Sequence, residues 1–173
     1  LLKTLNDQQT ASHHVGLKQV EEQEVYPTSF GQRRIWLACQ NEHFTQAFHT
    51  ERCYLSSGPL CIDSFKRAVN MLVLRHESLR TTFKQHKNDI YLKIHAEPGE
   101  GIIVIHSATT EENTKELVNK AVYEKFDLEQ GPLIRVHVIP QTSGAHVILI
   151  VVHHIESDAW SLNNLHVQLN ELY

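Results

Sequence analysis

A run of six apolar residues, 147–152, is followed directly by two histidines, His153 and His154. A short continuous apolar run predicts a strand that is covered on both faces and therefore lies inside a sheet. Since successive side chains of a strand point to opposite faces, the two imidazoles must diverge. We expect one imidazole to pack inward and the other to border open space. Asp158 follows four residues after the second histidine, where a helix begins.

The composition is that of an ordinary globular domain, with 41% hydrophobic and 21% charged residues. A net charge of −4 and the lack of a Lys/Arg run argue against a nucleic-acid surface. The longest apolar run, residues 147–152, is far too short to span a membrane. Cys39, Cys53 and Cys61 form no Cys-x-x-Cys pair, so we expect reduced thiols and a cytoplasmic location.

Periodicity and capping signals predict helices interleaved with strands. Ser29 with Gln32, and Thr109 with Glu112, have the spacing of capping boxes, and Asp63 is placed to cap the second helix. Helices are expected over residues 29–40, 63–79, 109–122 and from 159 onward, and strands over 47–55, 81–84, 90–95, 102–105, 133–139 and 146–152. This order predicts an α+β fold with a mixed sheet and flanking helices.

The two ends of the chain differ from its middle. Residues 1–24 are polar and turn-prone, which is typical of a linker, and residues 25–173 form the expected domain. The last predicted helix has no stop signal before Tyr173. We therefore expect the chain to be part of a longer one.

Three ordered motifs resemble those of the condensation domains of nonribosomal peptide synthetases. Residues 153–159 resemble the family signature His-His-x-x-x-Asp-Gly, with alanine in place of glycine. Residues 29–37 resemble the family's Ser-x-x-Gln-x-x-x-Trp segment, and residues 75–83 match Arg-His-Glu-x-Leu-Arg-Thr-x-Phe at every fixed position. Residues 126–133 are similar to a further recurring segment. The Ser-Phe-Gly-Gln start of residues 29–37 also resembles condensation domains of fungal polyketide synthase–peptide synthetase hybrids.

The resemblance implies a chloramphenicol-acetyltransferase-like fold in which two subdomains face each other across a tunnel. This chain would be the N-terminal subdomain, and the second subdomain would lie outside it. The implied reaction condenses a carrier-bound acyl thioester with the amine of a carrier-bound amino acid in secondary-metabolite biosynthesis. The implied partners are the acyl or peptidyl carrier domains of the same megasynthase, which hold phosphopantetheine. We expect no cofactor bound directly and no metal site, because adjacent strand histidines diverge and no cysteine pair completes a tetrahedral set.

The resemblance also assigns roles to single residues. It gives the reactive role to His154, which is suited to accept a proton from the amine near neutral pH. It gives a supporting role to His153. Asp158 would hold the loop through a salt bridge with an arginine, for which Arg80 and Arg75 are the candidates.

Two departures from the family pattern favour alternative functions. Ala159 replaces a glycine, and it would strain the loop if that backbone needs a positive φ. Glu156 stands where the family usually has an apolar residue, and a carboxylate close to His154 would favour the imidazolium form. With Ser161, Glu156 is a candidate for lining the tunnel. The alternatives are a degenerate, non-catalytic module that docks carriers or supports the synthase, and an acyltransferase that forms an ester.

Overall fold

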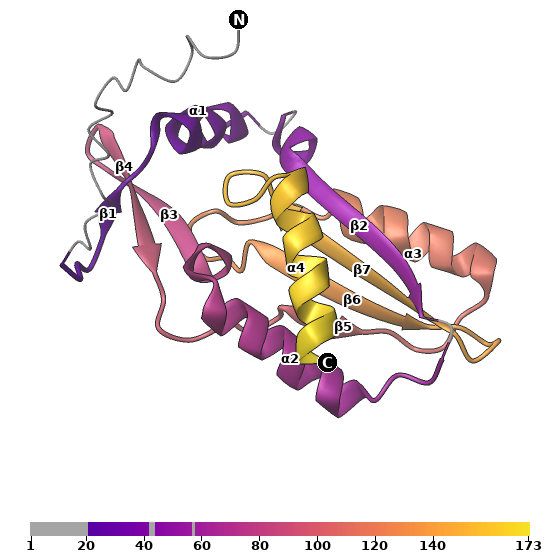
Figure 1. Ribbon diagram of the computed structural model, residues 1–173. Coiled ribbons are helices and arrows are strands. Elements are labelled where there is room, and N and C mark those ends of the chain that lie inside the picture. The colour runs from indigo at the N-terminus through magenta and orange to yellow at the C-terminus, as the bar shows by residue number, and fades with distance from the viewer. Residues whose placement is uncertain (1–20, 42–43, 57) are drawn as a thin grey trace, which may run out of the picture.

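The structure is a computed structural model that describes residues 21–41, 44–56 and 58–173 (Figure 1). The predicted linker, residues 1–24, lies almost entirely outside the described residues. The helices are α1 (Phe30–Cys39), α2 (Ile62–Arg75), α3 (Glu111–Tyr123) and α4 (Ala159–Leu172), with 3-10 turns η1 (Thr45–Phe48) and η2 (Glu77–Arg80). The strands are β1 (Tyr26–Pro27), β2 (His49–Ser56), β3 (Thr81–His86), β4 (Asp89–Ile94), β5 (Ile103–Ile105), β6 (Ile134–Pro140) and β7 (His146–His153).

The main sheet has the strand order β2-β7-β6-β5. Strand β7 pairs antiparallel with β2 and β6, whereas β5 pairs parallel with β6, so the sheet is mixed. The prediction of an inner strand over residues 146–152 is confirmed, as is the α+β fold class. Strands β3 and β4 form the predicted hairpin, but with β1 they make a separate three-stranded sheet.

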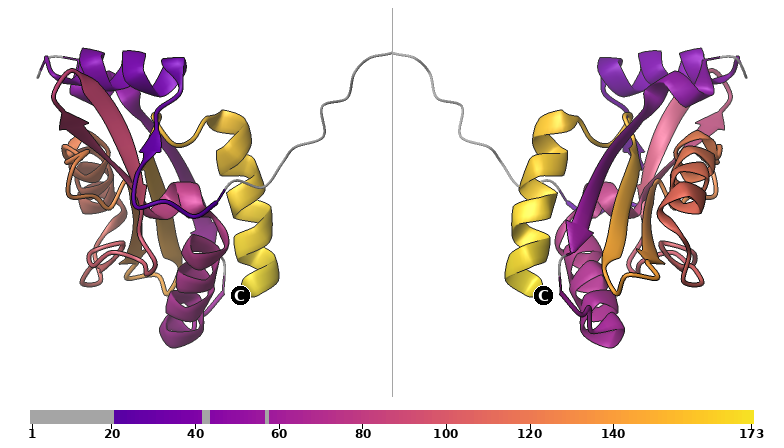
Figure 2. Two further views of the ribbon diagram at one scale, coloured as in Figure 1. Left: turned by 90° about the vertical axis from the view of Figure 1, so that its left-hand side faces the viewer. Right: turned by 90° about the vertical axis from the view of Figure 1, so that its right-hand side faces the viewer.

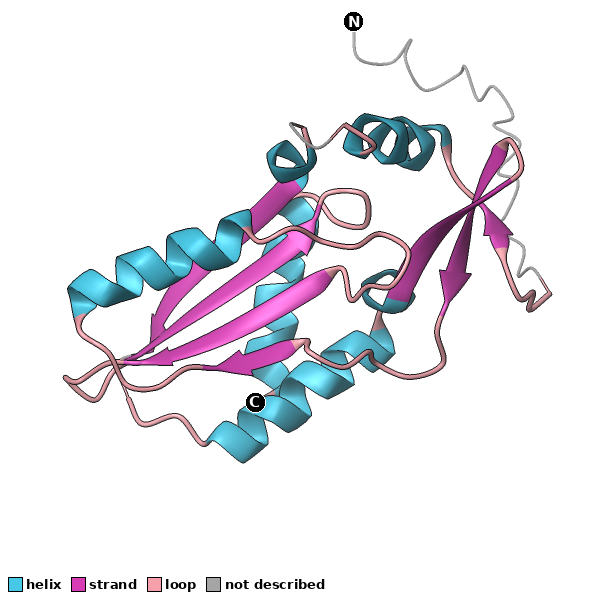
Figure 3. Cartoon of the chain, turned by 180° about the vertical axis from the view of Figure 1, so that it is seen from behind, coloured by secondary structure: helices cyan, strands magenta, loops and turns pink. Residues whose placement is uncertain are grey.

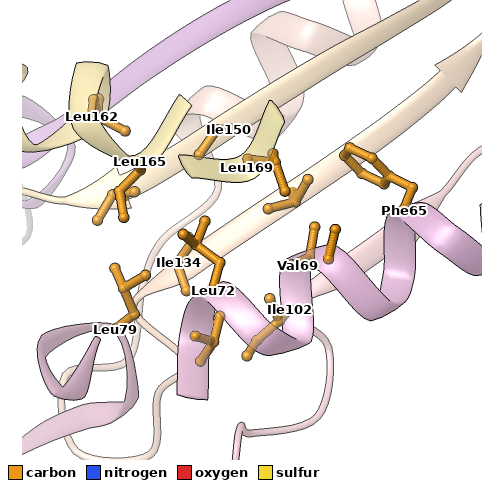
Figure 4. Close-up of a cluster of buried hydrophobic side chains, with 14 of the residues drawn as sticks. Phe65, Val69, Leu72, Leu79, Ile102, Ile134, Ile150, Leu162, Leu165 and Leu169 are labelled. Carbon is orange, nitrogen blue, oxygen red and sulfur yellow. The ribbon is translucent and has the colours of Figure 1, made fainter. Parts of the chain in front are cut away.

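Helices cover both faces of the main sheet (Figure 2). Helices α2 and α4 lie side by side on one face, and α3 lies on the other, where it is seen in front of the strands in Figure 3. The first face is the larger apolar core. Figure 4 shows leucines of α4 and apolar side chains of α2 directed toward the strands. Buried members of this core include Phe65, Val69, Leu72, Ile134, Ile150, Leu162, Leu165 and Leu169.

The opposite face combines apolar and polar side chains. Trp36 of α1, Leu149 and Val151 of β7, and Phe126 after α3 belong to its apolar cluster. Buried polar side chains lie in the same layer, because alternate residues of β6 and β7 point to this face. They are Arg135, His137 and His153.

Several predicted boundaries are wrong by a few residues. The second helix ends at Arg75, because His76 has extended backbone angles (φ −110°, ψ 102°), and a 3-10 turn follows. That helix begins after Cys61, so Asp63 lies in its first turn and does not cap it. Helix α3 is capped by Thr110, which accepts from the Asn113 N–H, and not by Thr109.

Candidate active site

Strand β7 ends at His153, whose imidazole is fully buried on the α3 side of the sheet. Its Nδ1 accepts a hydrogen bond from the Ile155 N–H at 3.2 Å, so in the neutral ring the proton is on Nε2. That Nε2–H points at the Cys39 sulfur, 3.6 Å away. The ring packs edge-on against His49 and Phe126, with centroids 5.8 and 5.9 Å distant. His153 is therefore locked in one tautomer.

Burial governs the charge of His153. Mainly through loss of hydration, with smaller contributions from His49 and His154, the pKa of His153 falls to about 3. Burial likewise raises the pKa of the Cys39 thiol to about 11, so this pair is neutral near pH 7. His153 and Cys39 are thus a packed, hydrogen-bonded anchor for the end of β7.

His154 has the opposite environment and the opposite tautomer. Its side chain is exposed, and its backbone N–H donates to the Phe48 carbonyl at 2.7 Å, which fixes the strand end against η1. Its Nδ1 lies 2.7 Å from the Ser157 carbonyl oxygen and must donate to it. In the neutral ring, Nε2 then carries the lone pair, and no described residue hydrogen-bonds to it. This is the arrangement that a proton acceptor requires.

Asp158 caps helix α4. One carboxylate oxygen accepts hydrogen bonds from the Ser161 N–H at 2.8 Å and the Ser161 hydroxyl at 2.7 Å. These bonds lower the pKa of the exposed Asp158 carboxyl. Asp158 thereby fixes where α4 begins, and Ser157, one residue earlier, holds the His154 ring.

The predicted salt bridge between Asp158 and an arginine does not form among the residues that the structure describes. The Arg80 guanidinium lies 3.5 Å from Glu77 and also donates to the His95 carbonyl. Arg75 donates to the Gln168 side chain at 3.3 Å. Because Arg80 and Arg75 are bonded elsewhere, the loop is held by Ser161 and backbone contacts instead.

Glu156 and Ser161 line a pocket of about 200 Å³ between η2, α4 and the loop that follows β7. The Glu156 carboxyl is largely buried, and its Oε1 has no hydrogen-bond partner among the described residues. Burial raises the pKa of Glu156 to about 8, so this group is mostly protonated at pH 7. It therefore places little negative charge next to His154.

The expected strain at Ala159 does not occur. Ala159 is the first residue of α4, and Lys87 is the only described residue other than glycine with a positive φ. The alanine that replaces the family's glycine thus adopts a helical conformation without steric cost.

Sequence reasoning missed the residues that surround His153. Cys39 comes from the end of α1, and Phe126 follows α3, so neither is near His153 in the sequence. His49 stands directly opposite His153 in the β2–β7 register. Its Nδ1–H donates to the Val122 carbonyl at 2.7 Å, which ties α3 to the site. The pairing of β2 with β7 and the packing of α1 and α3 on the sheet bring this cluster together, and no motif in the sequence encodes these contacts.

Metal-binding clusters and membrane-spanning helices are both missing from the described part of the chain. No cluster of three or more His, Cys, Asp or Glu side chains in residues 21–41, 44–56 and 58–173 has the geometry of a metal site. No helix in the same ranges is long and apolar enough to cross a membrane.

Curated proteins with similar sequences include synthetases and synthases that are far longer than this chain. The chain is 34% identical over 172 residues to malpibaldin synthetase of Mortierella alpina, an alignment that covers 96% of this chain and 3% of that protein. It is 32% identical over 157 residues to tyrocidine synthase 3 of Brevibacillus parabrevis, covering 91% of this chain and 2% of that protein. The chain thus spans a small fraction of the length of these relatives.

Solved structures share the fold. The X-domain from teicoplanin biosynthesis, in its complex with OxyB, matches with a TM-score of 0.83 and 25% identity over 91% of this chain and 34% of that chain. The starter condensation domain of the rhizomide synthetase matches with a TM-score of 0.77 and 18% identity over 87% of this chain and 39% of that chain.

The family model named Condensation domain matches residues 22–173, which is nearly the whole of the described chain. The matched segment contains the buried His153, the exposed His154 and the capped start of α4. The chain therefore belongs to the condensation domain family.

Proposed function

We propose that this chain is the N-terminal subdomain of a condensation domain that forms an amide bond. The reactants are an acyl thioester and the amine of an amino acid, each tethered to phosphopantetheine on a carrier domain of the same synthase. A second subdomain, outside this chain, would supply the other wall of the tunnel, and the synthase would act in the cytoplasm. A place among polyketide synthase–peptide synthetase hybrids remains a prediction from residues 29–37.

The observation that carries the proposal is the orientation of the His154 ring. Because Nδ1 donates to the Ser157 carbonyl, Nε2 is left as a bare acceptor on an exposed side chain at the end of a rigid inner strand. As the amine nitrogen attacks the thioester carbonyl carbon, Nε2 accepts the proton that the nitrogen loses. The C–S bond then breaks, and the imidazolium returns the proton to the departing thiolate.

The test replaces His154 by alanine in the complete synthase and measures the rate of amide formation in a single turnover. We expect a loss of roughly 100-fold or more, the usual range for a general base. His86→Ala is the matched control, because His86 is also an exposed histidine but lies at the end of the β3–β4 hairpin. Unchanged amide formation in His154→Ala would remove the catalytic role.

A non-catalytic docking module is the second candidate. It is favoured by Glu156 at a position where the family usually has an apolar residue, and by the similarity to the X-domain, which was solved in a complex with OxyB. If this candidate is right, Glu156→Val with Ala159→Gly gives no gain in amide formation, while deletion of the domain still stops product release.

An ester-forming acyltransferase differs only in its acceptor. Hydroxyl and amine acceptors on otherwise identical carriers, offered together to the complete synthase, distinguish it from the amide-forming enzyme. A product containing only the amide supports the main proposal, and a product containing only the ester overturns it.

A further inference from the structure

The Glu156 pocket has a feature that the role proposed for His154 does not use. Glu156 follows His154 by two residues, and its Oε1 is buried without a hydrogen-bond partner among the described residues. The pocket of about 200 Å³ is larger than a single water needs. A buried carboxyl group that lacks hydrogen-bond donors is costly. Because Glu156 also lines this pocket, a donor group that reaches its carboxyl from the pocket would bind favourably.

The pocket walls offer several hydrogen-bond acceptors. The Nε2–H of His76 donates to the Gln168 side-chain oxygen at 2.9 Å, so Nδ1 of the neutral His76 ring is an acceptor. The Ser161 hydroxyl donates its proton to Asp158, 2.7 Å away, and keeps its lone pairs. Asn164 lines the same pocket, and its side chain carries an amide oxygen that can accept a hydrogen bond.

The charged groups around the pocket are compatible with a bound cation. His76 is the only other titratable side chain among the described residues that line it. The two nearby arginines are engaged elsewhere, since Arg75 of α2 is hydrogen-bonded to a glutamine side chain and Arg80 of η2 is paired with Glu77. At the start of α4, the Asp158 carboxylate offsets the positive end of the helix.

We propose that this pocket binds a primary ammonium group, with the Glu156 carboxylate as its counter-ion. An ammonium has three donors and no acceptor, which matches the acceptors of Glu156, Ser161 and Asn164. A divalent metal ion fits poorly, because Ca²⁺ and Mg²⁺ need six or more oxygen ligands and the pocket has one carboxylate.

Binding releases a proton from the protein. The ligand arrives as R–NH₃⁺ and Glu156 is mostly protonated at pH 7, so the ion pair forms as the carboxyl proton passes to the buffer. Well above pH 8 the carboxyl is already ionised, and no proton is released. Affinity for the ammonium should therefore rise by about tenfold between pH 7 and pH 9 as long as the amine remains protonated.

The ammonium group can come from two sources, a free small amine or the amine of a tethered amino acid. The second source rests on the proposed function, whereas the first is independent of it. Methylammonium and glycinamide are the two probes, since glycinamide carries its amine next to a carbonyl as an aminoacyl group does. Binding of methylammonium alone indicates a free amine, and tighter binding of glycinamide indicates the acceptor substrate.

The experiment is isothermal titration calorimetry of the complete protein with each probe at pH 7, in phosphate and in HEPES, neither of which contains a primary amine. We expect a dissociation constant in the millimolar range, with close to one proton released per ligand bound. Glu156→Gln should weaken binding by about tenfold or more and abolish proton release. Glu171→Gln, on the exposed side of α4, is the matched control and should bind as the wild type does.

A second variant tests the pocket even if Glu156→Gln does not fold. Asn164→Leu keeps the carboxyl but removes one acceptor and narrows the pocket, and it should also lose affinity. Asn163→Leu changes the neighbouring exposed residue, which does not line the pocket, and this variant should keep the affinity of the wild type. Equal binding by wild type and both pocket variants, or no heat with any protein, would overturn the proposal. Neither outcome depends on the result for His154→Ala, so failure of this proposal can be distinguished from failure of the proposed function.

Discussion

The two faces of the main sheet differ in the side chains that bury them. The face under α2 and α4 is a layer of apolar, mostly aliphatic side chains from β6, β7 and both helices. The face under α3 includes the buried polar side chains of Arg135, His137 and His153 in the corresponding layer. The contrast indicates that one face supplies most of the stability of the fold, whereas the other uses buried polar contacts to fix the end of β7.

The polar contacts on the α3 face are only partly satisfied. Arg135 pairs with Glu124 at 3.0 Å and stacks on Phe126, 3.8 Å from the ring centroid. His137 shares a hydrogen bond of 3.0 Å with His106, yet its Nε2 is buried without a partner among the described residues. Burial, aided by the positive charges of His106 and Arg135, lowers the pKa of His137 to about 4. Burial on this face therefore disfavours the protonated form of His137.

The largest expected effect is on the aliphatic face. Ile150→Ala removes a buried side chain from the layer between β7 and the two helices, and should lower the free energy of unfolding by about 3 kcal/mol. Leu55→Ala, at a side chain that is 69% exposed on β2, should change it by less than about 0.5 kcal/mol. Urea denaturation of the complete domain measures both. Equal losses would show that the aliphatic layer is not where the stability resides.

The Glu156 carboxyl is a largely buried polar group next to the aliphatic face. It predicts that the free energy of unfolding falls as the pH rises. Its pKa is raised from 4.5 to about 8 in the folded state. Its contribution to stability is full below pH 4.5 and is lost as the pH rises through 8. Glu156→Gln should therefore be more stable than the wild type by about 3 kcal/mol at pH 7, and equally stable at pH 4. If Glu156→Gln is more stable than the wild type by the same amount at pH 7 and at pH 4, the pKa of Glu156 is not raised by burial.

The histidines of the α3 face predict the opposite pH dependence, with a smaller effect. The pKa of His137 is lowered from 6.5 to about 4, so its contribution is present above pH 6.5 and is lost as the pH falls toward 4. His137→Leu should reduce the loss of unfolding free energy between pH 7 and pH 5 by about 2 kcal/mol. His86→Ala, at an exposed histidine, is the control. If His137→Leu and wild type lose the same stability on acidification, His137 is not buried in the neutral form.

The sequence predicted those parts of the fold that local patterns encode. The run of apolar residues at 147–152 correctly indicated an inner strand, and Ser29 with Gln32 correctly indicated the capping box that begins α1. The two-residue strand β1 carries no periodicity, so its pairing with β4 could not be foreseen. The same is true of the separate hairpin sheet, because strand pairing depends on tertiary contacts.

The sequence predicted the directions of the side chains along β7, but not the contacts that these side chains make with other elements. Alternation along β7 correctly indicated that the His153 and His154 rings diverge. The contacts that decide the tautomers, Cys39 for one ring and the Ser157 carbonyl for the other, come from chain geometry that no spacing encodes. The predicted salt bridge between Asp158 and an arginine was wrong for the same reason, because the Asp158 carboxylate instead accepts hydrogen bonds from Ser161 at the start of α4.

The division of roles between the two adjacent histidines is tested most directly by their tautomers, read from ¹⁵N chemical shifts in the complete domain labelled at histidine nitrogens. We predict that His154 carries its proton on Nδ1, with an unprotonated Nε2. We predict that His153 carries its proton on Nε2 and stays neutral from pH 7 down to pH 5, because burial lowers its pKa to about 3. A protonated Nε2 in neutral His154, or a His153 ring that titrates above pH 5, would contradict this division of roles.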